Sequence, residues 1–128
     1  MPVSEALVLV ADDDEDILLL VTTRLRRDGF EVIAARNGEE ALELARERHP
    51  GIAVLDVGMP KLDGLEVLAQ IRADETLKTM RVLLLTAKAQ ESDMRRGYEA
   101  GADAYVRKPF SPSELSSRVI ELAAETRP

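Results

Sequence analysis

The stretch Ile52-Ala53-Val54-Leu55, with Asp56 directly after it, decides the fold. A short run that is apolar at every position, with two β-branched residues, is typical of a strand covered on both faces of a parallel sheet. Other short apolar, β-rich runs lie at Leu7–Ala11, Glu31–Ala35, Arg81–Leu85 and Ala104–Val106. The sequence therefore predicts five strands.

Amphipathic stretches between these runs predict helices, because apolar residues recur there at helical spacing. Four of the helices carry such residues at Ile17, Val21 and Leu25; Ala41, Leu42 and Ala45; Leu65, Leu68 and Ile71; and Leu115, Val119 and Leu122. The fourth helix in chain order, around Glu91 to Glu99, has the weakest pattern and is expected to turn Met94 and Tyr98 inward.

Capping residues support three of these helices. Gly29 is suited to follow the end of the first helix. Asn37 and Glu40 have capping-box spacing at the start of the second helix. Ser111-Pro112-Ser113-Glu114 combines an N-cap, proline at the first helical position and glutamate at the third. Five β–α units in succession predict a single α/β domain over residues 1–128, with a core of about 5–125.

Composition excludes several classes of function. The chain has 128 residues, a formal net charge of −7 and no cysteine, so neither disulfides nor thiolate metal sites are available. A domain this acidic is repelled by nucleic acid, and one histidine (His49) is too few for a histidine-based zinc site. Without a signal peptide or a bilayer-spanning apolar run, the expected location is cytoplasmic, with no membrane partner.

Acidic residues follow two of the predicted strands. Asp12-Asp13-Asp14 follows Leu7–Ala11, and Asp56 follows Ile52–Leu55. If the second strand lies outside the first, the third must cross to the first strand's other side, so the two acidic loops face each other. Converging carboxylates repel one another unless a cation compensates, and hard oxygen ligands suit Mg²⁺.

Helix capping is the competing explanation for each acid taken singly. An aspartate after a strand is often an N-cap, and capping is the favoured role of Asp14 and Asp16, which adjoin the first helix. Capping cannot use Asp12, Asp13 and Asp56 together, so a functional cluster is the better interpretation of these three.

The predicted carboxylate cluster favours a functional role for Lys108 and Thr86. A lysine at the carboxyl edge of a sheet is ordinarily solvated, but beside carboxylates it balances charge and grips a phosphoryl oxygen. Pro109 after it suits a cis bond that aims the lysine inward. Thr86 either caps the end of its strand or donates its hydroxyl to an incoming oxyanion.

The chain resembles the receiver domains of two-component response regulators over essentially its whole length. Four pieces carry the resemblance: Ala11–Asp14, Leu55–Gly64 (LDVGMPKLDG), Leu85–Ala87 and Gly101–Phe110 (GADAYVRKPF). The resemblance implies a doubly wound parallel (βα)5 sheet of flavodoxin-like strand order 2-1-3-4-5. It also implies a phosphorylation-activated signalling switch.

The resemblance assigns a role to each matching residue. It makes Asp56 the phosphoacceptor, with Mg²⁺ (or Mn²⁺) bound by Asp13, Asp56 and the carbonyl of Gly58. Asp12 would act through metal-bound water, and Lys108 would contact the phosphoryl group. Thr86 and Tyr105 would form the switch that alters the surface of the fourth helix, fifth strand and fifth helix.

The implied partners are a sensor histidine kinase or phosphotransfer protein and, downstream, an output protein or an effector domain outside this chain. No enzyme activity is expected beyond self-phosphorylation and autodephosphorylation. One group of receivers carries an acidic residue before the switch aromatic, as part of a charged dimer face. Ala104 stands there instead, which weakens but leaves open a phosphorylation-dependent homodimer. Gly58 and Lys88 are expected to tune the lifetime of the phosphorylated state.

Three alternatives differ in their requirements. A phosphohydrolase with an aspartyl phosphate needs a second aspartate two residues after the nucleophile, where this chain has Gly58. A dinucleotide-binding domain needs a glycine fingerprint where Asp12-Asp13-Asp14 stands. A receiver-like module that works without phosphorylation typically loses part of the acidic set or the lysine, and neither is lost here.

Overall fold

Five parallel strands form one sheet in the computed structural model, which describes residues 7–87, 95, 98 and 100–124. The sheet order is β2-β1-β3-β4-β5, as the resemblance implies. The strands are β1 (Leu7–Ala11), β2 (Glu31–Ala35), β3 (Ile52–Asp56), β4 (Arg81–Ala87) and β5 (Ala104–Lys108). Every residue of β1 and of β3 is buried, so these two central strands are covered on both faces as predicted.

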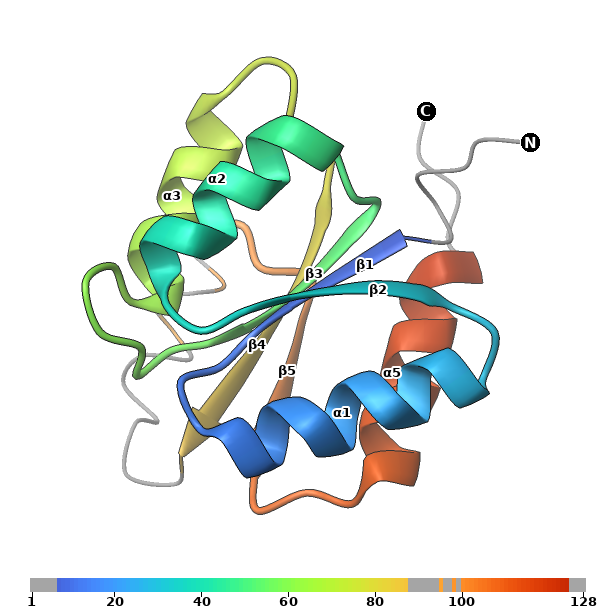
Figure 1. Ribbon diagram of the computed structural model, residues 1–128. Coiled ribbons are helices and arrows are strands. Elements are labelled where there is room, and N and C mark those ends of the chain that lie inside the picture. The colour runs from blue at the N-terminus through green and yellow to red at the C-terminus, as the bar shows by residue number, and fades with distance from the viewer. Residues whose placement is uncertain (1–6, 88–94, 96–97, 99, 125–128) are drawn as a thin grey trace.

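Helices cover the two faces of the sheet in pairs, α1 with α5 and α2 with α3 (Figure 1). Their bounds are α1 (Glu15–Arg27), α2 (Gly38–Arg48), α3 (Gly64–Ala73) and α5 (Pro112–Ala124). Strand side chains alternate between two apolar clusters, as the period of two in a strand requires. In β3, for example, Leu55 packs towards α2 and α3, while Val54 packs towards α1 and α5.

The caps of α1 and α5 agree with the sequence. Asp14 is the N-cap of α1, and its carboxylate accepts the N–H groups of Asp16 (2.9 Å) and Ile17 (3.2 Å). Asp16 is not a cap but the second residue of the helix, so its predicted role was wrong. The hydroxyl of Ser111 accepts the N–H of Glu114 at 3.0 Å, as expected at the start of α5.

Only one of the two hydrogen bonds of the capping box predicted for α2 is present. Asn37 accepts the N–H of Glu40 (2.9 Å), but the Glu40 carboxylate accepts the N–H of Arg36 (3.0 Å). A complete box lies instead at α3, where Asp63 and Glu66 each accept the other's backbone N–H at 2.8 and 3.0 Å. Both caps fix where the chain enters a helix after a strand.

The predicted fourth helix lies mostly outside the described residues, as do Met94 and Lys88. Tyr98 and Ala100 are helical. The inward orientation predicted for Tyr98 is wrong, because this residue is 56% exposed. Its ring packs edge-on against the buried Tyr105, with ring centroids 4.3 Å apart. Tyr98 therefore covers the core from outside rather than entering it.

Three strands run one or two residues beyond their predicted ends, to Asp56, Ala87 and Lys108. The extra residues belong to the sheet: Ala87 pairs with Lys108, and the N–H after Asp56 bonds to the Leu85 carbonyl at 2.9 Å. The polar side chains at this edge thus project from hydrogen-bonded strands, which restricts their positions.

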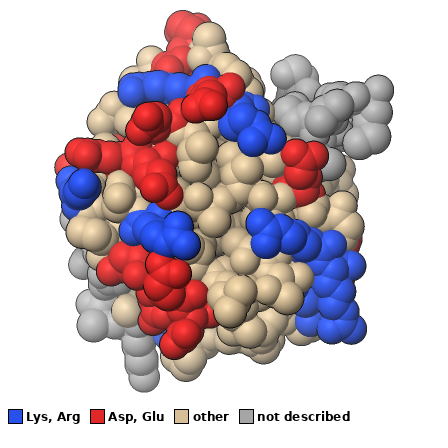
Figure 2. Space-filling model, in the orientation of Figure 1, with Lys and Arg blue, Asp and Glu red and all other residues tan. Residues whose placement is uncertain are grey.

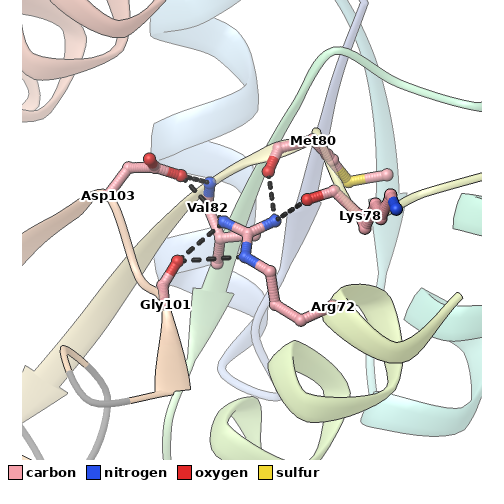
Figure 3. Close-up of polar contacts among 6 residues, drawn as sticks. All are labelled: Arg72, Lys78, Met80, Val82, Gly101 and Asp103. Atoms are coloured by element: carbon pink, nitrogen blue, oxygen red, sulfur yellow. Dashed lines mark hydrogen bonds and ion pairs between the residues drawn. The ribbon is translucent and has the colours of Figure 1, made fainter. Parts of the chain in front are cut away.

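Arg72 joins α3 to the end of the sheet at which β4 and β5 begin, opposite the carboxyl edge (Figure 3). Its guanidinium donates twice to the Gly101 carbonyl (3.0 and 2.7 Å) and lies 2.9 Å from the Asp103 carboxylate. It also donates to two carbonyls of the segment before β4, those of Lys78 (3.1 Å) and Met80 (2.5 Å). The same Asp103 oxygen accepts the Val82 N–H at 2.8 Å. We call Arg72, Gly101 and Asp103 the Arg72 clasp.

Within the described part of the chain, no helix combines the length and apolar character that crossing a membrane requires. On the face drawn in Figure 2, both acidic and basic side chains are present, with acidic groups at the left and a small basic group at the lower right. The basic group does not extend across the described part of that face, as a nucleic-acid-binding surface would require.

Candidate functional site

Three carboxylates meet at the carboxyl edge of the sheet. Asp12, Asp13 and Asp56 each offer an oxygen, and these oxygens lie within 4.8 Å of one another. The fold explains the meeting, because β1 and β3 are neighbours and Ala11 pairs with Leu55, which puts the residues after them side by side. The convergence expected from the sequence is thus present, and we call these three residues the acidic cluster.

The members of the acidic cluster differ in burial. Asp12 is fully buried and Asp56 is 6% exposed, whereas Asp13 is exposed. One oxygen of Asp12 accepts the N–H of Asp14 at 2.9 Å. This donor was missed from the sequence, because any residue type at position 14 would supply it. The backbone therefore orients Asp12, while Asp13 faces solvent.

Lys108 reaches the cluster from β5. Its ammonium nitrogen lies 3.1 Å from Oδ2 of Asp12 and 3.2 Å from Oδ1 of Asp56. The bond between Lys108 and Pro109 is cis, as predicted. One ammonium faces three carboxylates, so the cluster retains an excess of negative charge.

The pKa of Asp56 reflects both its burial and the excess negative charge of the cluster. Burial raises the pKa of Asp56, and the nearby Asp12 carboxylate raises it further. Lys108 and the N–H of Gly58, which lies 3.3 Å from Asp56 Oδ1, lower that pKa without cancelling the rise. For Lys108, burial lowers the pKa, but the carboxylates of Asp56 and Asp12 outweigh it and leave the pKa raised.

The acidic cluster suits a divalent cation. Its donors are hard oxygens, and its uncompensated charge favours a cation. Oδ2 of Asp12 is buried and forms no hydrogen bond of good geometry among the described residues. The ammonium of Lys108 contacts it as an ion pair, which leaves that oxygen able to accept from a metal-bound water.

Thr86 and Tyr105 are one and two strands away from Asp56. Thr86 is fully buried in β4, and its hydroxyl donates to the Ala87 carbonyl at 3.1 Å. A hydroxyl has one proton to donate, so the proton of Thr86 is used by the Ala87 carbonyl. Tyr105 is buried in β5, where its ring meets Tyr98. Of the residues predicted for the site, only Asp12, Asp13, Asp56, Gly58 and Lys108 are brought together by the described contacts.

The model of the response regulator receiver domain family matches residues 8–120. The chain belongs to this family. Its members are phosphorylation-activated switches of two-component signalling, and this domain is one of them. Family membership decides against the phosphohydrolase and the dinucleotide-binding domain.

Relatives of known name agree with this assignment. The chain is 48% identical over 112 residues to the alkaline phosphatase synthesis transcriptional regulatory protein PhoP of Bacillus subtilis, covering 88% of this chain and 46% of the relative. It is 42% identical over 126 residues to the probable transcriptional regulator ycf27 of Cyanophora paradoxa, covering 98% and 52%. The chain thus spans about half the length of these relatives.

Solved structures agree as well. A putative response regulator of Chloroflexus aurantiacus superposes with a TM-score of 0.87 at 37% identity, covering 93% of this chain and 98% of that one. The chemotaxis response regulator CheY4 of Vibrio cholerae gives 0.85 at 30% identity, covering 91% and 97%.

Proposed function

We propose that Asp56 accepts a phosphoryl group and that Mg²⁺, or Mn²⁺ in its place, is held by Asp12, Asp13, Asp56 and the Gly58 carbonyl. Asp13 and Asp56 would bind the cation directly, and Asp12 through water. The observation that carries the proposal is the meeting of three carboxylates with the ammonium of Lys108.

The chemistry follows from the residue types. An oxygen of Asp56 attacks phosphorus, the bond from phosphorus to the donor's nitrogen breaks, and an acyl phosphate forms. Lys108 stabilises charge on the transferring group from its position 3.2 Å from Asp56. A bound divalent cation supplies further charge neutralisation to the phosphoryl oxygens. Water later attacks phosphorus, the bond from phosphorus to the Asp56 oxygen breaks, and inorganic phosphate leaves, which returns the free carboxylate. The proposed reactions are thus limited to self-phosphorylation and autodephosphorylation.

A sensor histidine kinase or phosphotransfer protein is the proposed donor. An apolar pocket of about 320 Å³ adjoins the site and is lined by Ile17, Leu20, Lys108, Pro109 and Phe110. Nearby on α1, Leu19 and Leu20 are 66% and 47% exposed. Apolar surface beside Lys108 supports docking of a protein that presents its phosphohistidine to Asp56.

The proposed output is a change in the surface of the fourth helix, β5 and α5, produced by Thr86 and Tyr105 and recognised by an output protein or effector domain. The domain spans residues 1–128 with a core of about 5–125, and its proposed location is cytoplasmic. A homodimer of the phosphorylated form stays a prediction. Ala104 is 1% exposed and offers that dimer no charge.

Acetyl phosphate with Mg²⁺ tests the acceptor. We expect the mass of the wild type to rise by one phosphoryl group and Asp56→Asn to show no rise, because an amide is not nucleophilic. Asp16→Asn is a matched control: it makes the same chemical change at an exposed α1 residue and should retain uptake. Uptake by Asp56→Asn equal to the wild type, mapped to another residue, would overturn the assignment. No uptake by the wild type would favour a receiver-like module that works without phosphorylation.

A further inference from the structure

We infer that Gly38 is a positioning residue for cation binding, because it sets the place of the loop after Asp56. Gly38 is the first residue of α2 and is buried against that loop. An added Cβ would lie 1.9 Å from the Leu62 carbonyl oxygen and 2.5 Å from Leu62 Cβ. A real Cβ does not lie so close to other atoms, so the neighbouring segment would have to move. Glycine is therefore required here for space.

The backbone conformation of Gly38 does not require glycine. Its φ lies outside the left-handed region, which Gly29 and Gly101 do occupy with φ near +100°. Alanine in a helix is ordinarily more stable than glycine, because glycine loses more backbone freedom on folding. A loss on replacing Gly38 by alanine would therefore report the contact with Leu62 and not a helix preference.

The loop that meets Gly38 is the one that carries Gly58. Its far end is fixed by a second close approach, because a Cβ on Gly64 would lie 2.7 Å from the Asp56 carbonyl oxygen. The Gly64 N–H also bonds to the Val57 carbonyl at 3.2 Å. The segment from Val57 to Leu62 is thus held between β3 and the first turn of α2.

A side chain at position 38 would displace the loop more readily than the helix. Helix α2 is anchored by the buried Ala41, Leu42 and Ala45 and by its Asn37 cap. The loop exposes Gly58, Pro60 and Lys61. Val57 and Met59 anchor the start of the loop in the core cluster that also holds Ala41, Leu42 and Ala45. The exposed part of the loop is linked to α2 by an ion pair between Lys61 and Glu39 at 4.0 Å, which contributes little.

Displacement of this loop reaches the cation through Gly58. The Gly58 N–H contacts Asp56, and its carbonyl is a proposed ligand, so this inference rests on the proposed function. Gly38→Ala should weaken Mg²⁺ binding although no carboxylate or ammonium is changed. Supporting groups around a metal typically contribute about 10- to 100-fold in affinity. We expect a loss of about 10-fold.

The test is an Mg²⁺ titration of the whole chain, followed by the NMR shifts of the amides of Asp56 and Gly58. Gly29→Ala is the matched control: its added Cβ meets nothing within 4 Å, but its φ of +100° makes alanine strained. It should lose stability and keep the wild-type affinity for Mg²⁺. If Gly38→Ala is largely unfolded, the titration is made in trimethylamine N-oxide, which favours the folded state.

The outcomes separate this inference from the proposed function. Saturable binding by the wild type with about 10-fold weaker binding by Gly38→Ala supports both. Equal affinities of the two proteins would overturn the role of Gly38 and leave the metal site standing. Absence of saturable binding by the wild type would overturn the metal site itself, and the role of Gly38 with it.

Discussion

The surroundings of Asp56 disfavour its ionised carboxylate, yet the proposed cation site requires that carboxylate to be ionised. Burial and the Asp12 carboxylate raise its pKa above the ordinary value of 3.8. The folded state therefore binds this proton more tightly than the unfolded state does. At neutral pH, without a cation, the ionised Asp56 destabilises the fold.

We predict that Asp56→Asn stabilises the metal-free protein at neutral pH. The amide keeps the shape of the side chain and removes the repulsion from Asp12, while Lys108 keeps Asp12 as its partner at 3.1 Å. The expected gain in the free energy of unfolding is on the order of 1 kcal/mol. Urea unfolding in EDTA measures it, and a loss of similar size would contradict the argument.

The same gain should depend on pH. As the pH falls from neutral through the raised pKa of Asp56, the wild type takes up a proton on folding and gains stability. Below the ordinary value of 3.8 the unfolded chain is protonated too, and no further gain follows. The advantage of Asp56→Asn should therefore shrink between neutral pH and that value. Urea unfolding of both proteins across this range checks it, and an advantage independent of pH would exclude titration of Asp56 as its source.

The sequence was most informative at residues whose place follows from strand ends. Asp12, Asp56 and Lys108 end or follow strands of one parallel sheet, so the strand order brings them together. Gly38 was missed, because its role is a close backbone approach between segments distant in the chain, and no local pattern records such an approach. Tyr98 was misplaced, because helical spacing alone does not say which side of a weakly patterned helix faces the core.

At the scale of elements, the positions of strands and helices were predictable, and their ends less so. Apolar runs mark only the buried part of a strand. Ladder pairing continues through Asp56, Thr86 and Lys108, since backbone hydrogen bonds do not depend on the side chain. The Asn37–Glu40 spacing was read correctly for the cap, but Glu40 had an alternative donor in Arg36, which spacing does not reveal.

The Arg72 clasp gives a prediction at this scale. The side chains of Arg72 and Asp103 are 19% and 15% exposed, and the guanidinium satisfies carbonyls from two segments. Arg72→Met would leave the Asp103 carboxylate and these carbonyls without this donor. Breaking a fully buried pair from one side costs roughly 3–5 kcal/mol, and this pair is partly buried, so about 2 kcal/mol is the order expected here. We expect a loss of that order in the free energy of unfolding.

Arg46→Met is the matched control, because Arg46 is 54% exposed and lies 3.8 Å from Asp74. An exposed pair contributes at most about 1 kcal/mol, so this variant should remain near the wild type. The double variant Arg72→Met with Asp103→Asn should recover part of the loss, since it also removes the carboxylate charge that Arg72 compensates. Equal effects of Arg72→Met and Arg46→Met in urea unfolding would mean that the clasp does not join these elements energetically.

At the scale of the whole molecule, the excess charge of the acidic cluster makes stability depend on the cation. A cation bound by the folded form alone stabilises it by mass action, by roughly 1.4 kcal/mol at ten times the dissociation constant. We predict that roughly millimolar Mg²⁺ raises the melting temperature relative to EDTA. Asp13→Asn should reduce this gain without disturbing the core, because Asp13 is exposed. An unchanged midpoint for the wild type would contradict cation binding.

The switch is the property that involves the most of the molecule. A phosphoryl group on Asp56 adds charge and strong acceptor oxygens at the carboxyl edge of the sheet. Thr86 donates to the Ala87 carbonyl in the present structure and must give up this bond in order to donate to a phosphoryl oxygen. Thr86 is fully buried, so its movement changes the packing available to neighbouring side chains, among which we expect Tyr105 to respond.

We therefore predict that Thr86→Ala accepts phosphate at Asp56 but transmits it poorly to Tyr105. Beryllofluoride, a phosphoryl mimic, should shift the NMR signals of Tyr98 and Tyr105 in the wild type, because their rings are in contact with centroids 4.3 Å apart. In Thr86→Ala the shifts around Asp56 should persist, while those of both tyrosines should fall. A ligand moves a conformational equilibrium only by its differential affinity for the two states, and Thr86 is the proposed source of that difference. Wild-type shifts confined to the loops around Asp56 would leave a phosphoacceptor without this switch, and full tyrosine shifts in Thr86→Ala would assign the coupling to another residue.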